Sequence, residues 1–334
     1  MVSVIACNFI PSSRLFSSNF NTYLNKNKTT MVMTVQSSTD EKVGEEKIKR
    51  LLGRKIAFTT PSDYATRLIH LIEQEGAEPL WCPTVVVEFT DHTKQQVFKS
   101  IWEENNVGTE TLFDQYSAIA FTSRAGITAF AQALEGRGNP LNEKGDTFVV
   151  GALGRDAQLV RDLKFCVENP RVKTLVPTIA TPKGLVDELG DGHRRKILCP
   201  VPLVLGLDEP SVVPDFLMAL QAKGWDAVRL NAYVTRWAGS DCAQMLLGMS
   251  QIDAIVFTST AEIQGLLKSL CSFGVDWNMF KGRHPMVVAA HGPVTASGAQ
   301  RLGVQIDVVS KQFHSFAGVI DALALSWSSV NKKL

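Results

Sequence analysis

The chain has 334 residues, of which 45% are hydrophobic and 20% are charged, and its formal net charge at pH 7 is +1. This length exceeds the size at which a single hydrophobic core usually stops growing, so we expect two domains. The composition excludes a disordered or fibrous protein for most of the chain. The near-neutral charge argues against a nucleic-acid partner, and no apolar run is long enough to predict a membrane span.

The N-terminal segment differs in composition from the rest. Residues 1–39 are rich in Ser, Thr and Asn and contain no acidic residue before Asp40. This composition is typical of an organelle transit peptide, so we expect residues 1–50 to be a transit peptide with a disordered linker and the protein to reside in the chloroplast (plastid stroma). An ordinary disordered tail is the alternative. A cytoplasmic product that starts at Met31 or Met33 is also left open.

Short apolar runs predict strands that are buried on both faces of a parallel sheet. In chain order these runs lie at 55–60, 118–123, 147–152, 196–201, 254–259 and 286–290. The stretches between them, such as 64–76 and 214–224, carry apolar residues at helical spacing and end at glycine, which predicts helices. Alternating strands and helices indicate an α/β fold with right-handed crossovers. Ligands are then expected at the carboxyl ends of the strands.

Two segments of the chain are near copies of each other. AIAFTSRAGITAFAQAL at 118–134 and AIVFTSTAEIQGLLKSL at 254–270 share eight of seventeen positions, at an offset of 254 − 118 = 136. Other pairs follow in the same order, namely RKI at 54 and 195, and VVGALG at 149 with VVAAHG at 287. We therefore expect an internal repeat, in which two homologous halves each form an α/β unit.

Hydroxyl-bearing residues follow several predicted strands. Ser259 and Glu262 have the spacing of a capping box, so Ser259 either caps its own helix or binds a ligand. Ser123 has Gly126 at the position of that glutamate, which leaves its helix N-terminus open to an anion. The turn at 292–295 offers free amide groups and a hydroxyl for a carboxylate or phosphate, although a capping threonine explains it equally well.

The spacing of cysteine and histidine predicts neither a disulfide framework nor a metal site. The six cysteines are scattered without a C-x-x-C pair, and the six histidines show no H-x-x-x-H or H-E-x-x-H spacing. We therefore expect buried or idle thiols in a reducing compartment and no bound metal.

Taken in order, these elements resemble the uroporphyrinogen-III synthase family over residues 53–326. The residues that carry the resemblance are the doubled Phe-Thr-Ser strand ends at 121–123 and 257–259, Tyr-Val-Thr at 233–235, Gly-Pro-Val-Thr-Ala at 292–296, and the ending at 303–323.

The resemblance implies two flavodoxin-like α/β domains of parallel sheet joined by two antiparallel linker strands, at 83–90 and 229–236. The first domain would comprise 51–86 plus 236–330, and the second would comprise 87–235. It also implies a lyase (hydro-lyase) that cyclises hydroxymethylbilane to uroporphyrinogen III, with inversion of ring D and loss of water, in tetrapyrrole biosynthesis. The substrate is a linear tetrapyrrole polycarboxylate. No cofactor is implied, and we expect a monomer.

By this resemblance, Tyr233 is the catalytic proton donor, with packing between the domains as the alternative role. Arg155 stands where the family often has a hydroxyl and would serve as a hydrogen-bond donor to a substrate carboxylate. The substrate-binding residues implied are Thr122, Ser123, Arg155, Ser259, Gly292 and Thr295.

The resemblance also implies an active cleft between the two domains. Three other arginines are expected near this cleft, each with a solvated surface charge as the alternative. They are Arg67, Arg124 and Arg236.

Two other functions remain open from the sequence. A non-catalytic homologue would keep the cleft to bind a tetrapyrrole or another polyanion. A flavodoxin-like FMN binder is disfavoured, because neither half has a hydroxyl-and-glycine phosphate loop after its first strand.

Overall fold

The structure is a computed structural model that describes residues 49–105 and 108–330. Residues Ile48–Leu334 cluster into one compact unit. The predicted transit peptide lies outside the described residues, apart from its last two positions. The described chain folds into two main β-sheets, each with helices on both faces.

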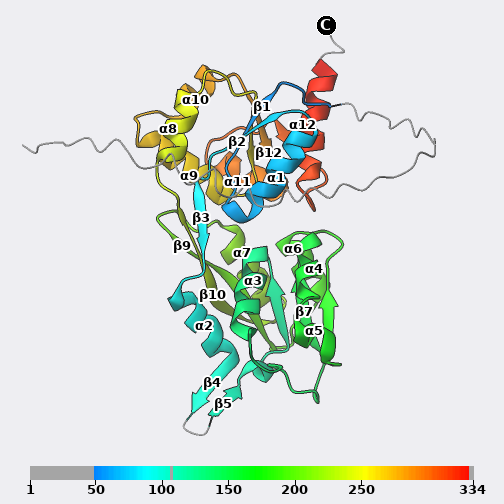
Figure 1. The fold of residues 1–334 in the computed structure, drawn as a ribbon. Coiled ribbons are helices and arrows are strands. Elements are labelled where there is room, and N and C mark those ends of the chain that lie inside the picture. Colours follow the sequence, from blue (N-terminus) through cyan, green and yellow to red (C-terminus); the bar gives the residue numbers. More distant parts are fainter. Residues whose placement is uncertain (1–48, 106–107, 331–334) are drawn as a thin grey trace, which may run out of the picture. The chain divides into compact units, whose positions relative to one another are not determined.

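The first main sheet has five parallel strands, and its strand order is β13-β12-β11-β1-β2. In Figure 1 the blue strands β1 and β2 lie in the same sheet as strands from the C-terminal third of the chain. The strands are β1 (Lys55–Phe58), β2 (Glu78–Trp81), β11 (Ala254–Phe257), β12 (Val287–Ala290) and β13 (Val308–Val309).

The side chains of β1 alternate between the two faces of this sheet and contribute to the hydrophobic core on each face. Ile56 and Phe58 pack against one set of helices, α1 (Ser62–Gln74) and α12 (Ala317–Val330). Ala57 belongs to the cluster on the opposite face. Because successive side chains of a strand point to opposite faces, a continuous apolar run buries both faces at once. The helices of the second face are α8 (Asp241–Gly248), α9 (Thr260–Cys271), α10 (Trp277–Arg283) and α11 (Pro293–Arg301).

The second main sheet has six strands in the order β3-β10-β9-β6-β7-β8. All neighbours are parallel except β3, which pairs antiparallel with β10 through Val85 to Glu88. The segments predicted as linker strands therefore do pair antiparallel, and they form one side of this sheet. The strands are β3 (Val85–Glu88), β6 (Ala118–Phe121), β7 (Phe148–Ala152), β8 (Val172–Leu175), β9 (Lys196–Leu205) and β10 (Asp226–Trp237).

Helices also cover both faces of the six-stranded sheet. One cluster joins α2 (Asp91–Ile101), α3 (Arg124–Leu134), α4 (Ala157–Val160) and α5 (Lys164–Glu168) to the sheet. The other joins α6 (Pro182–Leu189) and α7 (Val212–Ala222) to it. The remaining elements are a hairpin of β4 (Trp102–Asn105) and β5 (Gly108–Thr111), and the short 3₁₀ turns η1 (Phe113–Gln115) and η2 (Gly154–Asp156).

The fold is thus α/β with mostly parallel sheets, as the sequence predicts. All six predicted strands are present where expected. The predicted domain boundaries at 86/87 and 235/236 stay predictions. The five-stranded sheet takes its strands from both ends of the described chain, and the six-stranded sheet takes its strands from the middle.

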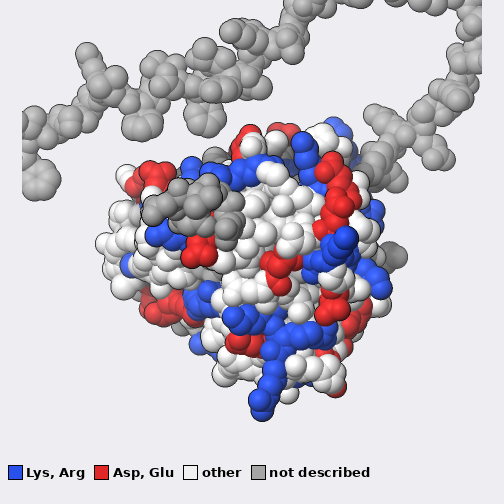
Figure 2. Space-filling model, turned by 90° about the horizontal axis from the view of Figure 1, so that it is seen from below, with Lys and Arg blue, Asp and Glu red and all other residues white. Residues whose placement is uncertain are grey.

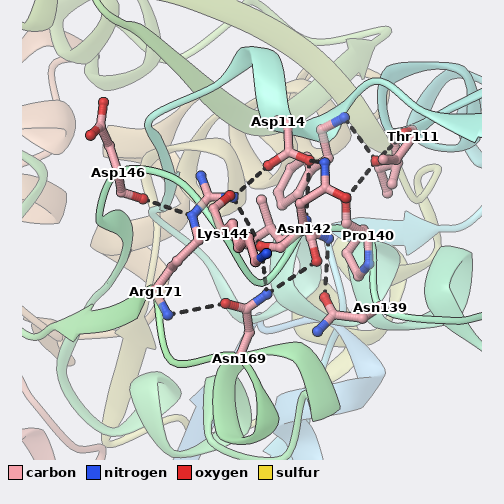
Figure 3. A network of polar contacts seen from close by, with 12 residues as sticks. Thr111, Asp114, Asn139, Pro140, Asn142, Lys144, Asp146, Asn169 and Arg171 are labelled. Atoms are coloured by element: carbon pink, nitrogen blue, oxygen red, sulfur yellow. Dashed lines mark hydrogen bonds and ion pairs between the residues drawn. The ribbon is translucent and has the colours of Figure 1, made fainter.

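A polar network fixes the loop between α3 and β7, and Figure 3 shows it from close by. Arg171 donates to the carboxylate of Asp114 at 2.7 Å and to the backbone carbonyls of Asn142, Lys144 and Asp146 at 2.9, 3.1 and 2.8 Å. One guanidinium therefore satisfies three loop carbonyls that no strand pairs. Its role is structural, because none of these residues lines the cavity described below.

On the face shown in Figure 2, Lys and Arg side chains are interspersed with Asp and Glu side chains, so neither sign dominates that face.

No helix in the described part of the chain is long and apolar enough to cross a membrane. The five cysteines at residues 82, 166, 199, 242 and 271 are free thiols.

Candidate active site

A cavity of about 430 Å³ is lined by residues from the carboxyl ends of strands in both main sheets. This volume lies within the usual range for small-molecule sites. All seven residues predicted for the site line this cavity: Thr122, Ser123, Arg155, Tyr233, Ser259, Gly292 and Thr295. The structure thus brings together residues that are up to 295 − 122 = 173 positions apart in the chain. Their individual roles remain predictions.

Tyr233 is placed by an irregularity in β10. The register of β10 against β9 shifts between Asn231 and Tyr233, so Ala232 is an extra residue opposite β9. Strict alternation would send adjacent residues to opposite faces, yet Ala232 and Tyr233 belong to the same buried cluster. β-Bulges often re-aim side chains beside functional sites. The bulge falls opposite Pro202, which has no backbone N–H to donate.

Within the described residues, the Tyr233 hydroxyl has one hydrogen-bond partner, the hydroxyl of Ser123. Their oxygens lie 2.8 Å apart, and either group can donate. Ser123 is also the N-cap of α3, where its Oγ accepts the backbone N–H of Gly126 at 3.1 Å. Tyr233 is only 5% exposed, and this burial raises its pKa to about 12. The phenol therefore keeps its proton throughout the neutral pH range.

The capping box predicted at Ser259 forms only in part. The backbone N–H of Glu262 donates to Ser259 Oγ at 3.3 Å, as expected of an N-cap. The carboxylate of Glu262 instead accepts the N–H of Thr258 at 3.0 Å, one residue earlier than a capping box requires. It also accepts the hydroxyls of Thr59, Thr258 and Ser259, at 2.8, 2.5 and 3.2 Å. Ser259 therefore serves its own helix while also lining the cavity.

Glu262 is a buried carboxyl at the wall of the cavity, and the sequence did not single it out as part of the site. The residue is 1% exposed, and burial raises the pKa of its carboxyl, although the hydrogen bonds from Thr258, Thr59 and Ser259 act in the opposite direction. Through these hydrogen bonds, the Glu262 carboxylate connects the residues that follow β1 and β11 with the start of α9.

The turn that opens α11 is shaped by close packing. A Cβ at Gly292 would lie 2.8 Å from Cβ of Phe313, so only glycine fits without a shift. Gly292 is the N-cap of α11 and contributes no side chain to the cap. The Thr295 hydroxyl does not cap the helix; it donates to the carbonyl oxygen of Thr258 at 3.0 Å. Helix α11 is thereby tied to the end of β11.

The arginines divide into two groups. Arg124 pairs with Asp156 at 3.1 Å, and Arg236 pairs with Glu88 at 2.6 Å. Arg67 and Arg155 line the cavity, and neither makes a hydrogen bond or ion pair with any other described residue. For Arg67 the structure therefore favours a site residue over a plain surface charge.

Other residues that were not among the seven predicted for the site also line the cavity, including Tyr64 and His291. Burial raises the pKa of the Tyr64 phenol, with the nearby charge of Asp156 acting in the same direction. Burial also lowers the pKa of His291 to about 4, so its ring is neutral at pH 7. Residues 313–316, just before α12, also line the cavity. No group of three or more possible metal ligands occurs among the residues the structure describes.

The fold and cavity define an α/β protein in which strand ends of both main sheets meet at one cavity, lined by apolar residues, several hydroxyls and two arginines. Comparison with known proteins gives the family. The family model described as uroporphyrinogen-III synthase HemD matches residues 66–319, which is more than half of the chain. The chain belongs to the uroporphyrinogen-III synthase family, a family of enzymes, which confirms the resemblance seen in the sequence.

One solved structure supports the same fold. A mutant, selenomethionine-labelled uroporphyrinogen III synthase from the extremely thermophilic bacterium Thermus thermophilus is 16% identical, with a TM-score of 0.51 and coverage of 82% of this chain and 100% of that chain. The wild-type enzyme in a second crystal form is also 16% identical, with coverage of 83% and 99% and a TM-score of 0.39. A search of curated proteins returned no match.

Proposed function

We propose that the protein is an active uroporphyrinogen-III synthase, a lyase that cyclises hydroxymethylbilane with inversion of ring D and loss of water and needs no cofactor. The observation that supports this most is the gathering of all seven predicted residues on one cavity, in a chain that belongs to the family. The physiological role would be tetrapyrrole biosynthesis.

The chemical task is mainly one of orientation. An electron-rich pyrrole expels its hydroxyl with modest help, and the free bilane can close without an enzyme to the uninverted isomer. The protein must hold the chain so that the substituted carbon of ring D, instead of its free position, attacks the carbocation. The C–O bond breaks as water leaves, and the substituted carbon of ring D forms a C–C bond to the resulting carbocation, which gives a spiro intermediate. The older C–C bond from that carbon to its methylene bridge then breaks. The bridge carbon bonds to the free position of ring D, and that position loses its proton.

Tyr233 would assist the departing hydroxyl. In the proposed arrangement the Gly126 N–H donates to Ser123 Oγ, and the Ser123 hydroxyl donates to the Tyr233 oxygen. The phenol proton is then free to donate to the substrate oxygen. Because the pKa of Tyr233 is about 12, it acts as a hydrogen-bond donor that strengthens as the C–O bond breaks.

The carboxylates of the substrate would be bound by hydroxyls, helix-end amides and cations around the cavity. Thr122 contributes a hydroxyl that makes no hydrogen bond with other described residues. Ser259 and Thr295 keep acceptor capacity, although their protons are already donated. Gly292 lets the turn at the start of α11 pack against Phe313 beside the cavity.

We further propose that the two sheets are the cores of two flavodoxin-like domains that arose from an internal repeat. The repeat matches each strand of one sheet to a strand of the other, so the strands can be numbered 1 to 5 by their place in the repeat unit. With this numbering, both sheets have the strand order 2-1-3-4-5, which is the order of flavodoxin-like sheets. In the five-stranded sheet this corresponds to β2-β1-β11-β12-β13, and in the other sheet to β10-β9-β6-β7-β8.

For residues 1–50 we propose targeting to the plastid, supported by their composition alone. Fusion of this segment to a fluorescent protein in plant cells should give plastid fluorescence. Diffuse cytoplasmic fluorescence would overturn the proposal.

The function is tested with freshly prepared hydroxymethylbilane. After oxidation of the products, chromatography separates the type I and type III porphyrin isomers. We expect mainly type III with the protein and only type I in its absence. Formation of the type I isomer alone would contradict the synthase activity. If the protein also bound a tetrapyrrole tightly, it would instead be a non-catalytic tetrapyrrole-binding homologue.

A further inference from the structure

Four side chains with a full charge line the cavity: Arg67, Arg155, Asp156 and Glu262. Both carboxylates already have partners, because Asp156 accepts from Arg124 and Glu262 accepts from an amide and three hydroxyls. Neither cation has a hydrogen-bonding or ion-pair partner within the described ranges 49–105 and 108–330. The wall of the cavity therefore carries two guanidinium groups that have no ion-pair partner among the described residues, in a protein whose net charge is only +1.

Arg67 lies on α1, next to the five-stranded sheet, and is half-buried. Its guanidinium is 5.5 Å from the ring centroid of Phe316, a cation–π contact that holds the side chain at the cavity. Its pKa is lowered from the usual value, first by burial and then by the positive charges of Arg155 and Arg124. The guanidinium stays charged at pH 7 and lies near two like charges. The carboxylate of Asp156 acts on the pKa in the opposite direction, but its ion pair is with Arg124.

Arg155 reaches the same cavity from the six-stranded sheet. It lies in the η2 turn after β7, and its neighbours fix this turn on both sides. Asp156 is held by Arg124, and Gly154 has φ +50° and packs near Ala180 and His314. Arg155 itself is exposed and keeps all its donors available. Two guanidinium groups that approach from different sheets are stabilised best by an anion between them.

We propose that Arg67 and Arg155 together bind one carboxylate group of the substrate, one arginine from each sheet. This inference rests on the proposed function for the identity of the substrate, and it adds Arg67 as a specificity-determining residue. Each planar guanidinium can present two parallel N–H groups to a carboxylate in a fixed geometry, whereas the ammonium of a lysine has no such rigid pair. The pair would select for a tetrapyrrole that carries acidic side chains and would fix the position of one ring relative to both sheets.

The test uses uroporphyrin III, a stable fluorescent octacarboxylate, as the binding probe. The variants are Arg67→Gln, Arg155→Gln, the double variant and Arg67→Lys, with Arg301→Gln as the control. Arg301 is an exposed arginine in the last turn of α11 that does not line the cavity, so its replacement removes the same charge elsewhere. Melting temperatures identify any loss of binding that is caused by unfolding.

We expect each cavity variant to raise the Kd for uroporphyrin III about tenfold, as the loss of one charge-assisted hydrogen-bonding group predicts. Arg67→Lys should recover part of the affinity, and Arg301→Gln should match the wild type. In turnover, KM for hydroxymethylbilane should rise with little change in kcat. Wild-type affinity should fall more steeply with added salt than that of the double variant.

The outcomes separate this inference from the proposed function. If the wild type makes the type III isomer and both single variants keep its Kd and KM, the arginine site is wrong and the function stands. If the wild type makes only the type I isomer but binds uroporphyrin III through both arginines, the site stands and the function is wrong. If the wild type binds no uroporphyrin III and both single variants keep its KM for hydroxymethylbilane, the arginine site is wrong, and the isomer formed decides the function separately.

Discussion

At the scale of single residues, the site depends on small irregularities that place polar groups among apolar ones. Tyr233 reaches the cavity because β10 carries an extra residue, Ala232, opposite a proline in β9. The sequence indicates that Tyr233 lies on a strand, but the bulge depends on the pairing of two distant strands. For this reason sequence patterns predicted the residue and missed the geometry that positions it.

Replacement of Tyr233 by phenylalanine should lower kcat by about 100-fold, since it removes the donor to the leaving hydroxyl. The lost hydrogen bond to Ser123 is worth about 1 kcal/mol, so the melting temperature should fall by only a few degrees. Tyr116→Phe is the matched control, because Tyr116 is also buried but does not line the cavity. Normal turnover of Tyr233→Phe, or its global unfolding, would contradict the catalytic role.

Glu262 gives a pH-dependent prediction. Burial raises the pKa of its carboxyl above the usual 4.5, so the folded chain binds this proton more tightly than the unfolded chain. Its contribution to stability is therefore fully present below about pH 4.5 and is lost as the pH rises through the folded-state pKa. Glu262→Gln removes this titration while keeping the shape and one carbonyl acceptor for the Thr258 N–H.

We expect the free energy of unfolding of the wild type to fall relative to Glu262→Gln as the pH rises from 4 to 7, measured by urea denaturation. A constant difference over this range would show that the pKa is not raised. Glu262→Ala should be destabilised by at least about 1–3 kcal/mol at any pH in this range, because it leaves buried donors without an acceptor.

At the scale of elements, the position of α11 decides where Gly292 and Thr295 lie. Helix α11 packs on α9 through Gly298, where a Cβ would lie 1.9 Å from Thr260 Oγ1 and 2.7 Å from Thr260 Cγ2. Such a close approach needs a residue without a side chain. The contact holds the helix against the start of α9, whose N-cap is Ser259. Two predicted parts of the site are thus linked by one glycine.

Gly298→Ala should destabilise the protein by about 1–3 kcal/mol through overpacking and should raise KM, because α11 must move. Thr260→Ala in the same chain should restore part of the lost stability. The control Gly282→Ala lies on α10 with nothing within 4 Å of the new Cβ, so it should be neutral or slightly stabilising. Thermal unfolding measures all four proteins. Equal melting temperatures for Gly298→Ala and Gly282→Ala would refute the close contact.

Elements with strong local signals could be predicted from the sequence, and contacts that depend on chain-distant packing could not. The apolar runs gave the strands, and glycines with positive φ, Gly76 and Gly224, end the turns after two predicted helices. Arg67 was expected near the cleft together with Arg124 and Arg236, but no local signal distinguishes it from these two, since only the packing of α1 brings it to the cavity beside Arg155. Likewise, nothing in the local sequence around Glu262 shows that its carboxylate turns to Thr258 and Thr59.

At the scale of the whole molecule, the cavity collects residues from Pro61 to Phe316, and so it requires nearly the full length of the compact unit. The overall charge is close to zero, yet the charges at the cavity are arranged so that its two unpaired groups are both positive. In the proposed function, selectivity for an anionic substrate would therefore come from local placement of charge and not from the net charge of the chain.

A truncated chain that begins at Lys49 should keep the melting temperature and the site of the full chain. It retains Arg50, whose guanidinium pairs with Glu75 at 2.8 Å and with Asp321 at 2.6 Å, and it retains every cavity residue. Uroporphyrin III titration and thermal unfolding compare the two forms. A marked loss of binding in the truncated chain would show that residues 1–48 take part in the site.

The decisive measurement is the isomer ratio formed from fresh hydroxymethylbilane as a function of protein concentration. If the cavity orients the bilane as proposed, the type III fraction rises with protein until it exceeds the spontaneous type I product, and the rise is strongly reduced in Tyr233→Phe. A product that stays type I at every protein concentration would contradict the proposed synthase activity.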